Sequence, residues 1–283
     1  MKFPLFNSLS VGSVALIAAL AITPASALTV GQWNFEEGTP GNPVVGVNSV
    51  LDQSGNANHG SPTGNPIYSG DVAPGTGSAS LALDGNGDYV SIAHSATLNL
   101  TSAFTVEFRM KAGVAGNSGL RLLVDKSHGF VDSTGWAFQM IDGRMNLNTG
   151  AGGGGASNFP GGADSTDLRD DQWHHIAGTY DVTDTGQELK LYIDGMLEGA
   201  FSVGTYVGNT RDVVIGAACV FPGCNFSNKR FYNGLIDDLR ISNTALTADQ
   251  FLNASTQVPA PAGIVLFALA AAGLGLKRLQ NRN

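Results

Sequence analysis

Alternating hydrophobic and polar residues are the clearest pattern in the middle of the chain. At 104–110, Phe, Val, Phe and Met alternate with Thr, Glu and Arg, and this period of two is typical of a half-buried strand in an antiparallel sheet. Similar runs at 138–141 and 189–193 are each followed by Asp-Gly and another apolar run. Because Asp-Gly supplies the positive φ angles of two-residue hairpins, the pattern predicts hairpins over 138–147 and 189–197.

Further strands and very little helix are expected elsewhere. Strands are predicted at 80–83, 89–92, 120–124, 173–180, 213–215 and 235–241. Thr247 and Gln250 have capping-box spacing and open a helical turn or two through Phe251 and Leu252. The glycine-rich stretch up to Asp167 shows no periodicity and is predicted to be a long loop. Many strands and frequent turns predict an all-β sandwich or jelly roll.

The N-terminal segment has the features of a secretion signal. Lys2 precedes an apolar run at 9–22, and Ala25-Ser26-Ala27 is a small-residue site of the kind that signal peptidase cuts. We therefore expect residues 1–27 to be a signal peptide with a signal helix, the alternative being a buried core helix. The protein is then exported.

The C-terminal segment has a similar modular order. Val258, Pro259 and Pro261 precede an apolar run at 263–276 and then a basic end. The run is shorter than the roughly 20 residues that cross a bilayer. This order resembles a PEP-CTERM sorting signal, although Ala260 stands where that signal has Glu. The resemblance implies a short apolar helix, cleavage by a sorting enzyme of the exosortase type, and release to the cell surface or extracellular matrix. The competing interpretation is a membrane tail, so anchoring is either transient or retained.

Composition limits the partners of the region between these ends, residues 28–256, which we expect to be one domain followed by a sorting segment at 257–283. All 23 Asp and Glu residues lie between the two end segments, whereas four of the 15 Lys and Arg residues lie within them. This acidic balance argues against nucleic acid and anionic lipid as partners. It suits an extracellular domain that collects divalent cations.

Cys219 and Cys224 are the two cysteines of the chain. In an exported protein, this close pair predicts a local disulfide that closes the loop between them. Two thiols at this spacing also occur at the start of zinc sites, but the chain has no second pair.

A set of short segments in a fixed order resembles the laminin-G-like, concanavalin A-like domain. The resemblance spans about residues 30–253 and implies an antiparallel two-sheet jelly-roll sandwich. It does not by itself imply an activity, because such domains serve as binding modules, adhesion modules and glycoside hydrolases. The segments are 33–36 (WNFE), 52–56 (DQSGN), 83–90 (LDGNGDYV), 104–108 (FTVEF), 173–180 (WHHIAGTY), 191–195 (LYIDG) and 234–241 (GLIDDLRI).

The same resemblance implies a structural calcium ion. In that family a calcium often ties the N-terminal segment to the last strand, and Asp52 and Asp237 are the matching positions. Asn56 and one of Asp237 and Asp238 would complete the ligands, because adjacent strand residues point to opposite faces. The alternative is that these carboxylates make only turn and backbone hydrogen bonds. Residues 84–88 superficially resemble an EF-hand loop, but we expect a turn between two strands.

Catalytic signatures are missing from the sequence. Neighbouring His174 and His175 face opposite ways in a strand, so we expect packing in place of zinc binding. Glycosidases need paired carboxylates, and Glu107 has Thr105 and Arg109 at the alternate positions. We therefore expect no catalytic residues and no enzyme.

Carbohydrate binding is the remaining expectation, because sugar sites combine aromatic platforms with amide and carboxylate groups. The expected ligand-binding residues are Phe130, Trp136, Phe221, Asn225 and Phe226. The sequence thus predicts a surface or matrix protein that binds extracellular polysaccharide. The alternatives are a structural or adhesion module that binds a surface protein, and a diverged glycoside hydrolase.

Overall fold

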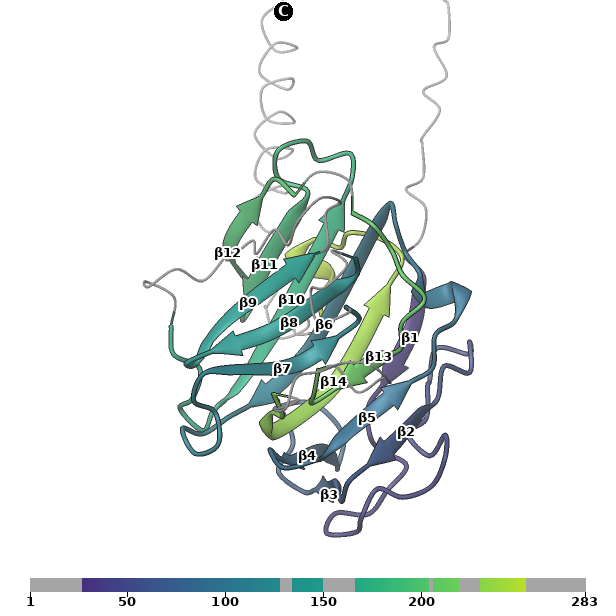
Figure 1. Cartoon of the computed structure of the whole chain (residues 1–283), viewed down its shortest axis with the longest axis vertical. Coiled ribbons are helices and arrows are strands. Elements are labelled where there is room, and N and C mark those ends of the chain that lie inside the picture. The colour runs from purple at the N-terminus through teal and green to yellow at the C-terminus, as the bar shows by residue number, and fades with distance from the viewer. Residues whose placement is uncertain (1–26, 128–133, 150–165, 204–205, 219–229, 253–283) are drawn as a thin grey trace, which may run out of the picture.

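Two antiparallel sheets form the domain, shown in Figure 1. The computed structural model describes residues 27–127, 134–149, 166–203, 206–218 and 230–252. Both predicted end helices lie outside these residues. Within them, no helix is long and apolar enough to cross a bilayer.

The larger sheet has eight strands in the order β12-β11-β10-β6-β14-β4-β3, with β1 also pairing with β14. Strands β6 and β14 lie at its centre, so the last strand of the domain is held between early ones. The strands are β1 (Thr29–Trp33), β3 (Ile67–Ser69), β4 (Ser80–Asp84), β6 (Ala103–Lys111), β10 (Trp173–Asp181), β11 (Leu189–Ile193), β12 (Met196–Phe201) and β14 (Asn233–Ser242).

The smaller sheet has six strands in the order β2-β5-β13-β7-β8-β9. Its strands are β2 (Gly60–Thr63), β5 (Tyr89–Ile92), β7 (Leu120–Asp125), β8 (Trp136–Ile141), β9 (Arg144–Thr149) and β13 (Val213–Ile215). Two short 3-10 turns complete the described structure, at Ala96–Leu98 and Ala248–Gln250.

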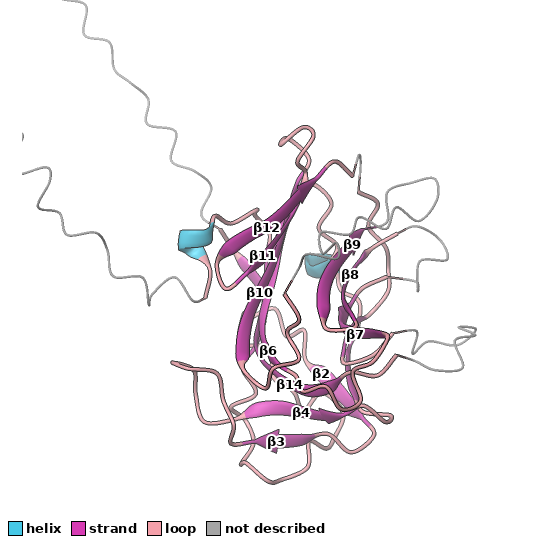
Figure 2. Ribbon diagram, turned by 90° about the vertical axis from the view of Figure 1, so that its left-hand side faces the viewer, coloured by secondary structure: helices cyan, strands magenta, loops and turns pink. Residues whose placement is uncertain are grey.

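The hydrophobic core fills the space between the two sheets. Figure 2 shows the ribbon of the two sheets from the side. Phe108 of β6 meets Phe138 of β8 edge-on, with ring centroids 5.2 Å apart. Gly178 in β10 allows the sheets to approach here, because a Cβ at this position would lie 2.4 Å from Leu147 and 2.6 Å from Phe138. The sheets therefore touch most closely where a side chain is absent.

The structure confirms the predicted strands and both Asp-Gly hairpins. Asp142 and Asp194 have φ angles of +47° and +52°, and each is followed by a glycine with positive φ, as type I′ turns require. The capping box at Thr247 is also present, but it opens only a three-residue 3-10 turn, because Phe251 returns to extended backbone.

Candidate functional site

The outer face of the six-stranded sheet carries a row of side-chain amides. Along β8 and β9, large apolar residues point into the core and the alternate positions point outward. Gln139 pairs with Asn146 across the two strands, and Asn148 pairs with Ala137. The three amides therefore lie on one face of adjacent strands, where cross-strand neighbours are about 5 Å apart. We call Gln139, Asn146 and Asn148 the amide row.

These amides are buried, yet their carbonyl oxygens have no hydrogen-bond partner. Gln139, Asn146 and Asn148 are 3%, 1% and 2% exposed. Oε1 of Gln139 and Oδ1 of both asparagines find no donor in the described part of the chain. An unpaired buried polar group costs about 1–3 kcal/mol, so the amide row holds three acceptors that an incoming donor would satisfy.

Charged groups flank the amide row at both ends. Asp125 of β7 pairs with Ala137 and so lies on the same face as Asn148. Burial raises its pKa to about 7, against the opposing hydrogen bonds from Ser127. At the other end, Arg144 lies two residues before Asn146 on β9, and its Nε is buried without a partner in the described residues.

The chain reaches these strands through segments that lie outside the described residues. Residues 128–133 join β7 to β8, residues 150–165 follow β9, and residues 219–229 lie between β13 and β14. The predicted sugar-binding residues Phe130, Phe221, Asn225 and Phe226, both cysteines, Ala25, Val258, Pro259 and Pro261 fall outside the described structure.

Trp136 was expected to bind sugar from a loop, but it lies in a strand. It begins β8, is 3% exposed, and packs against Phe104 and Phe138 at centroid distances of 6.3 and 6.0 Å. The strand starts earlier than the hydrophobic pattern indicated, and the indole therefore turns into the core. The amide row was missed because Gln and Asn at alternate strand positions resemble an ordinary solvated face.

The outer face of the eight-stranded sheet also holds buried polar groups, and its buried carboxylate is paired, although Nε of Arg109 and Nδ1 of His175 have no hydrogen-bond partner in the described residues. Glu107 of β6 is fully buried; its Oε2 lies 2.8 Å from Nε2 of His175, and its Oε1 accepts from Nε of Arg240 at 2.7 Å. Burial alone would raise the pKa of Glu107, but His175 and Arg240 outweigh it and hold the pKa below its usual value. This carboxylate is therefore held by an ion-pair and hydrogen-bond network, and its charge also helps to raise the pKa of the neighbouring Asp238.

The predicted calcium ligands serve separate turns in this structure. Asp52 accepts hydrogen bonds of 2.8–2.9 Å from Gln32, Asn58 and twice from Ser54, which occupies both carboxylate oxygens. Asn56 donates to the carbonyl of Val30.

The last-strand carboxylates of that prediction contact other segments. Asp237 accepts from Thr76 at 3.0 Å, and Asp238 lies 3.6 Å from Arg109 in a bulge where its φ is +49°. Within the described ranges, no three His, Cys, Asp or Glu side chains group to hold a metal ion. Asp52 and Asp237 thus bond to different segments of the described chain, and calcium binding stays a prediction.

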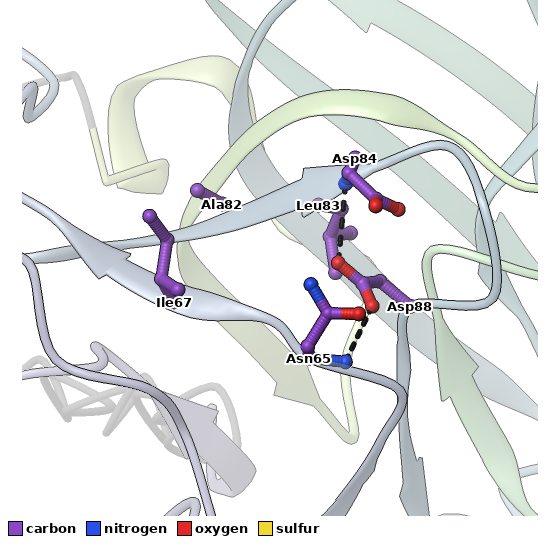
Figure 3. Close-up of a pocket in the computed structure, with 6 residues that line it drawn as sticks. All are labelled: Asn65, Ile67, Ala82, Leu83, Asp84 and Asp88. Atoms are coloured by element: carbon purple, nitrogen blue, oxygen red, sulfur yellow. Dashed lines mark hydrogen bonds between the residues drawn. The ribbon is translucent and has the colours of Figure 1, made fainter.

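The segment 84–88 forms the expected turn between β4 and β5 and borders a small pocket of about 180 Å³. Figure 3 shows the carboxylate of Asp88 directed at backbone nitrogens, accepting from Asn65 at 2.7 Å and from Asp84 at 3.3 Å. Both of its oxygens are used, so the acid fastens the turn. Similarly, His174 bonds Asp194 and Asp170, away from His175.

Solved structures share this fold at low sequence identity. The binding domain of Paraclostridial Mosquitocidal Protein 1 is 17% identical with a TM-score of 0.54, covering 78% of this chain and 50% of that one. The binding domain of botulinum neurotoxin DC, in complex with rat synaptotagmin II, is 13% identical with a TM-score of 0.55, covering 81% and 51%. This chain spans about half the length of those toxin domains.

A neighbour of similar size to this domain is domain 4 of AbnA, a GH43 extracellular arabinanase from Geobacillus stearothermophilus, in complex with arabinotriose. It is 19% identical with a TM-score of 0.52, covering 79% of this chain and 96% of that one. No curated protein matches the chain by sequence. The family model described as the concanavalin A-like lectin/glucanases superfamily, laminin G type 3, matches residues 84–251. That match covers more than half of the 283 residues, and the protein therefore belongs to this superfamily.

Proposed function

We propose that this is an exported, non-catalytic protein that binds extracellular polysaccharide on the outer face of its six-stranded sheet. The observation that carries the proposal is the amide row, three buried carbonyl oxygens without donors on one face. Sugar hydroxyls donate to such oxygens and, unlike water, arrive as a connected set with fixed spacing. One bound glycan would donate hydrogen bonds to several acceptors while losing the translational entropy of only one molecule.

The charges of this face favour an uncharged polysaccharide. Arg144 acts on Asp167, whose pKa it helps to lower, and Arg230 acts on Asp125. Arg144 and Arg230 thus each have an acidic neighbour. The chain as a whole carries a net charge of −8, which would repel an acidic glycan at long range. Hydroxyl groups therefore match the amide row better than carboxylates or sulfates do.

The sequence adds two supports to this proposal. The aromatic residues predicted as sugar platforms, Phe130, Phe221 and Phe226, belong to segments joined directly to strands of the same sheet. The signal-like start and the PEP-CTERM-like end would deliver the domain to the surface or matrix, where polysaccharide is abundant. Disulfide closure between Cys219 and Cys224, and calcium, remain parts of the proposal for this environment.

Glycan-array binding of the exported protein tests the proposal, with uncharged and uronic-acid glycans and with calcium or chelator. We expect binding to an uncharged class, and at least a 10-fold loss of affinity in the double variant Asn146→Leu/Asn148→Leu, because apolar side chains cannot accept from hydroxyls. Asn86→Leu, in the exposed turn before β5, is the matched control and should bind normally.

Binding that both variants retain equally would place the site elsewhere on the molecule. A blank array, with capture of a surface protein, would favour the alternative of an adhesion module. The edge strand β12 favours that alternative, since Met196 and Leu197 there are 72% and 53% exposed. Release of sugar from a bound glycan would instead revive the diverged hydrolase.

A further inference from the structure

A segment after the last strand crosses the outer face of the eight-stranded sheet. Residues 244–252, here called the strap, follow β14 and include the 3-10 turn Ala248–Gln250. Leu246 and Phe251 are buried with Ala177 of β10 in a cluster separate from the main core. Phe251 also meets Tyr192 edge-on, with ring centroids 5.1 Å apart. The strap therefore has its own small apolar anchor.

Side chains of the sheet hold the start of the strap through its backbone. Thr105 Oγ1 accepts from the nitrogen of Leu246 at 2.8 Å and donates to the carbonyl of Thr244 at 2.7 Å. Neither contact depends on the identity of the strap residue, because both use backbone atoms. This end is thus fixed in register with β6.

The paired charges of the same face hold the other end. Glu107 Oε2 accepts from the nitrogen of Leu252 at 2.9 Å, and Arg240 Nη2 donates to the carbonyl of Gln250 at 2.9 Å. Arg109 Nη2 donates to the carbonyl of Leu252 at 3.4 Å. One buried carboxylate and two guanidinium groups therefore bind the backbone at the end of the 3-10 turn and just after it.

We propose that the strap opens as a unit while the sandwich stays folded, and that Glu107 is the positioning residue that keeps it closed. The strap adds no strand to either sheet, and segments held by few backbone ladders open at lower free energy than the whole fold. Opening removes the strap contacts but leaves Glu107, Arg240 and His175 bonded to one another. No lone buried charge results, so opening avoids the large cost of breaking an ion pair.

Opening of the strap changes how far the residues after Leu252 can extend from the domain. The nine strap residues would add up to about 30 Å of extended chain. Val258, the start of the predicted sorting motif, is six positions beyond Leu252. If the proposed sorting route holds, opening of the strap would give a processing enzyme easier access to that motif. This consequence rests on the proposed export, whereas the opening does not.

Hydrogen exchange of the full chain, followed by mass spectrometry, tests the opening. We expect strap amides of wild-type protein, including Leu246 and Leu252, to exchange faster than those of β6 yet slower than unprotected amides. Glu107→Gln removes one acceptor and Phe251→Ala removes the apolar anchor. Each should speed strap exchange at least 10-fold. Phe251→Ala should leave β6 unchanged, Glu107→Gln should also speed β6 exchange because Arg240 and His175 lose their buried partner, and Glu198→Gln on the exposed edge strand should change neither.

Equal exchange rates for the strap and β6 in wild-type protein would overturn the proposal, since the strap would then open only with the fold. If the Glu107→Gln variant fails to fold, Phe251→Ala still tests the proposal. Wild-type strap protection in folded Phe251→Ala protein, or in folded Glu107→Gln protein, would overturn it as well. Neither result depends on polysaccharide binding, so the two proposals can fail separately.

Discussion

The two outer faces of the sandwich both bury polar side chains, but they differ in whether the buried acceptor oxygens are paired. On the eight-stranded sheet, Glu107 is bonded to three residues, His175 of β10, Arg240 of β14 and Leu252 of the strap. On the six-stranded sheet, the amide row leaves three carbonyl oxygens unpaired in the described structure. A buried group that is satisfied internally stabilises a fold, whereas one left unsatisfied is a cost that a ligand can remove. The six-stranded face is therefore the one that we propose to bind polysaccharide, and the eight-stranded face the one that stabilises the fold.

The largest effect is expected where the paired face is broken. Arg240→Leu leaves Glu107 buried without its guanidinium, and removing one partner of a buried pair costs about 3–5 kcal/mol. The free energy of unfolding in urea should fall by about that amount. Arg169→Leu is the matched control, because its partner Asp167 is 45% exposed and the pair lies 2.6 Å apart; exposed pairs contribute about 0–1 kcal/mol. Similar losses of unfolding free energy in both variants would show that the buried ion pair is no more important for stability than the exposed one.

Asp237 should give a smaller, pH-dependent effect at the margin of the same face. Burial and the charge of Asp238 raise its pKa from 3.8 to about 7. The folded state then holds the proton more tightly than the unfolded state does, so stability is greatest below pH 4 and falls as the pH rises to 7. Relative to Asp237→Asn, wild-type protein should lose about 2–4 kcal/mol between pH 4 and pH 8.

Urea unfolding of both proteins across that pH range measures the difference. Parallel curves for wild type and Asp237→Asn would mean that the carboxylate is compensated. If added calcium abolishes the fall in wild-type protein alone, a cation supplies the compensation, and the predicted metal ligation by Asp237 gains direct support.

The sequence predicted the sandwich because its central strands alternate strictly and its hairpins carry Asp-Gly. The strands it missed have weak patterns for physical reasons. β2 contains Pro62, which cannot donate to a ladder and suits only an edge strand. β3 has three residues and is also an edge. β1 gains its place from pairing with β14, more than 200 residues away, and local periodicity carries no such information.

The candidate site was less accessible to sequence reasoning. The sequence placed Glu107 on a strand without an acidic residue at the alternate positions, but its partners Arg240 and His175 come from distant strands and could not be predicted. Gln139 and Asn146 could be placed on one face only after the 138–147 hairpin was recognised. That they would be buried without partners is a property of packing, which composition and spacing do not report.

The smallest change in the free energy of unfolding is expected for the amide row. This prediction tests the difference between the two outer faces most directly. Replacing Asn146 and Asn148 by apolar side chains of similar size removes the desolvation cost of their two unpaired oxygens, and breaks one 3.1 Å hydrogen bond, from Nδ2 of Asn146 to the carbonyl of Arg144. Asn146→Leu/Asn148→Leu should therefore change the free energy of unfolding by less than about 1 kcal/mol, and a slight increase fits the same argument. A loss of several kcal/mol would mean that the amides are satisfied within the fold. Retained stability together with lost polysaccharide binding would show that the unpaired oxygens bind a ligand. Polar groups of that kind add nothing to the free energy of unfolding of the free protein and contribute only when the ligand is bound.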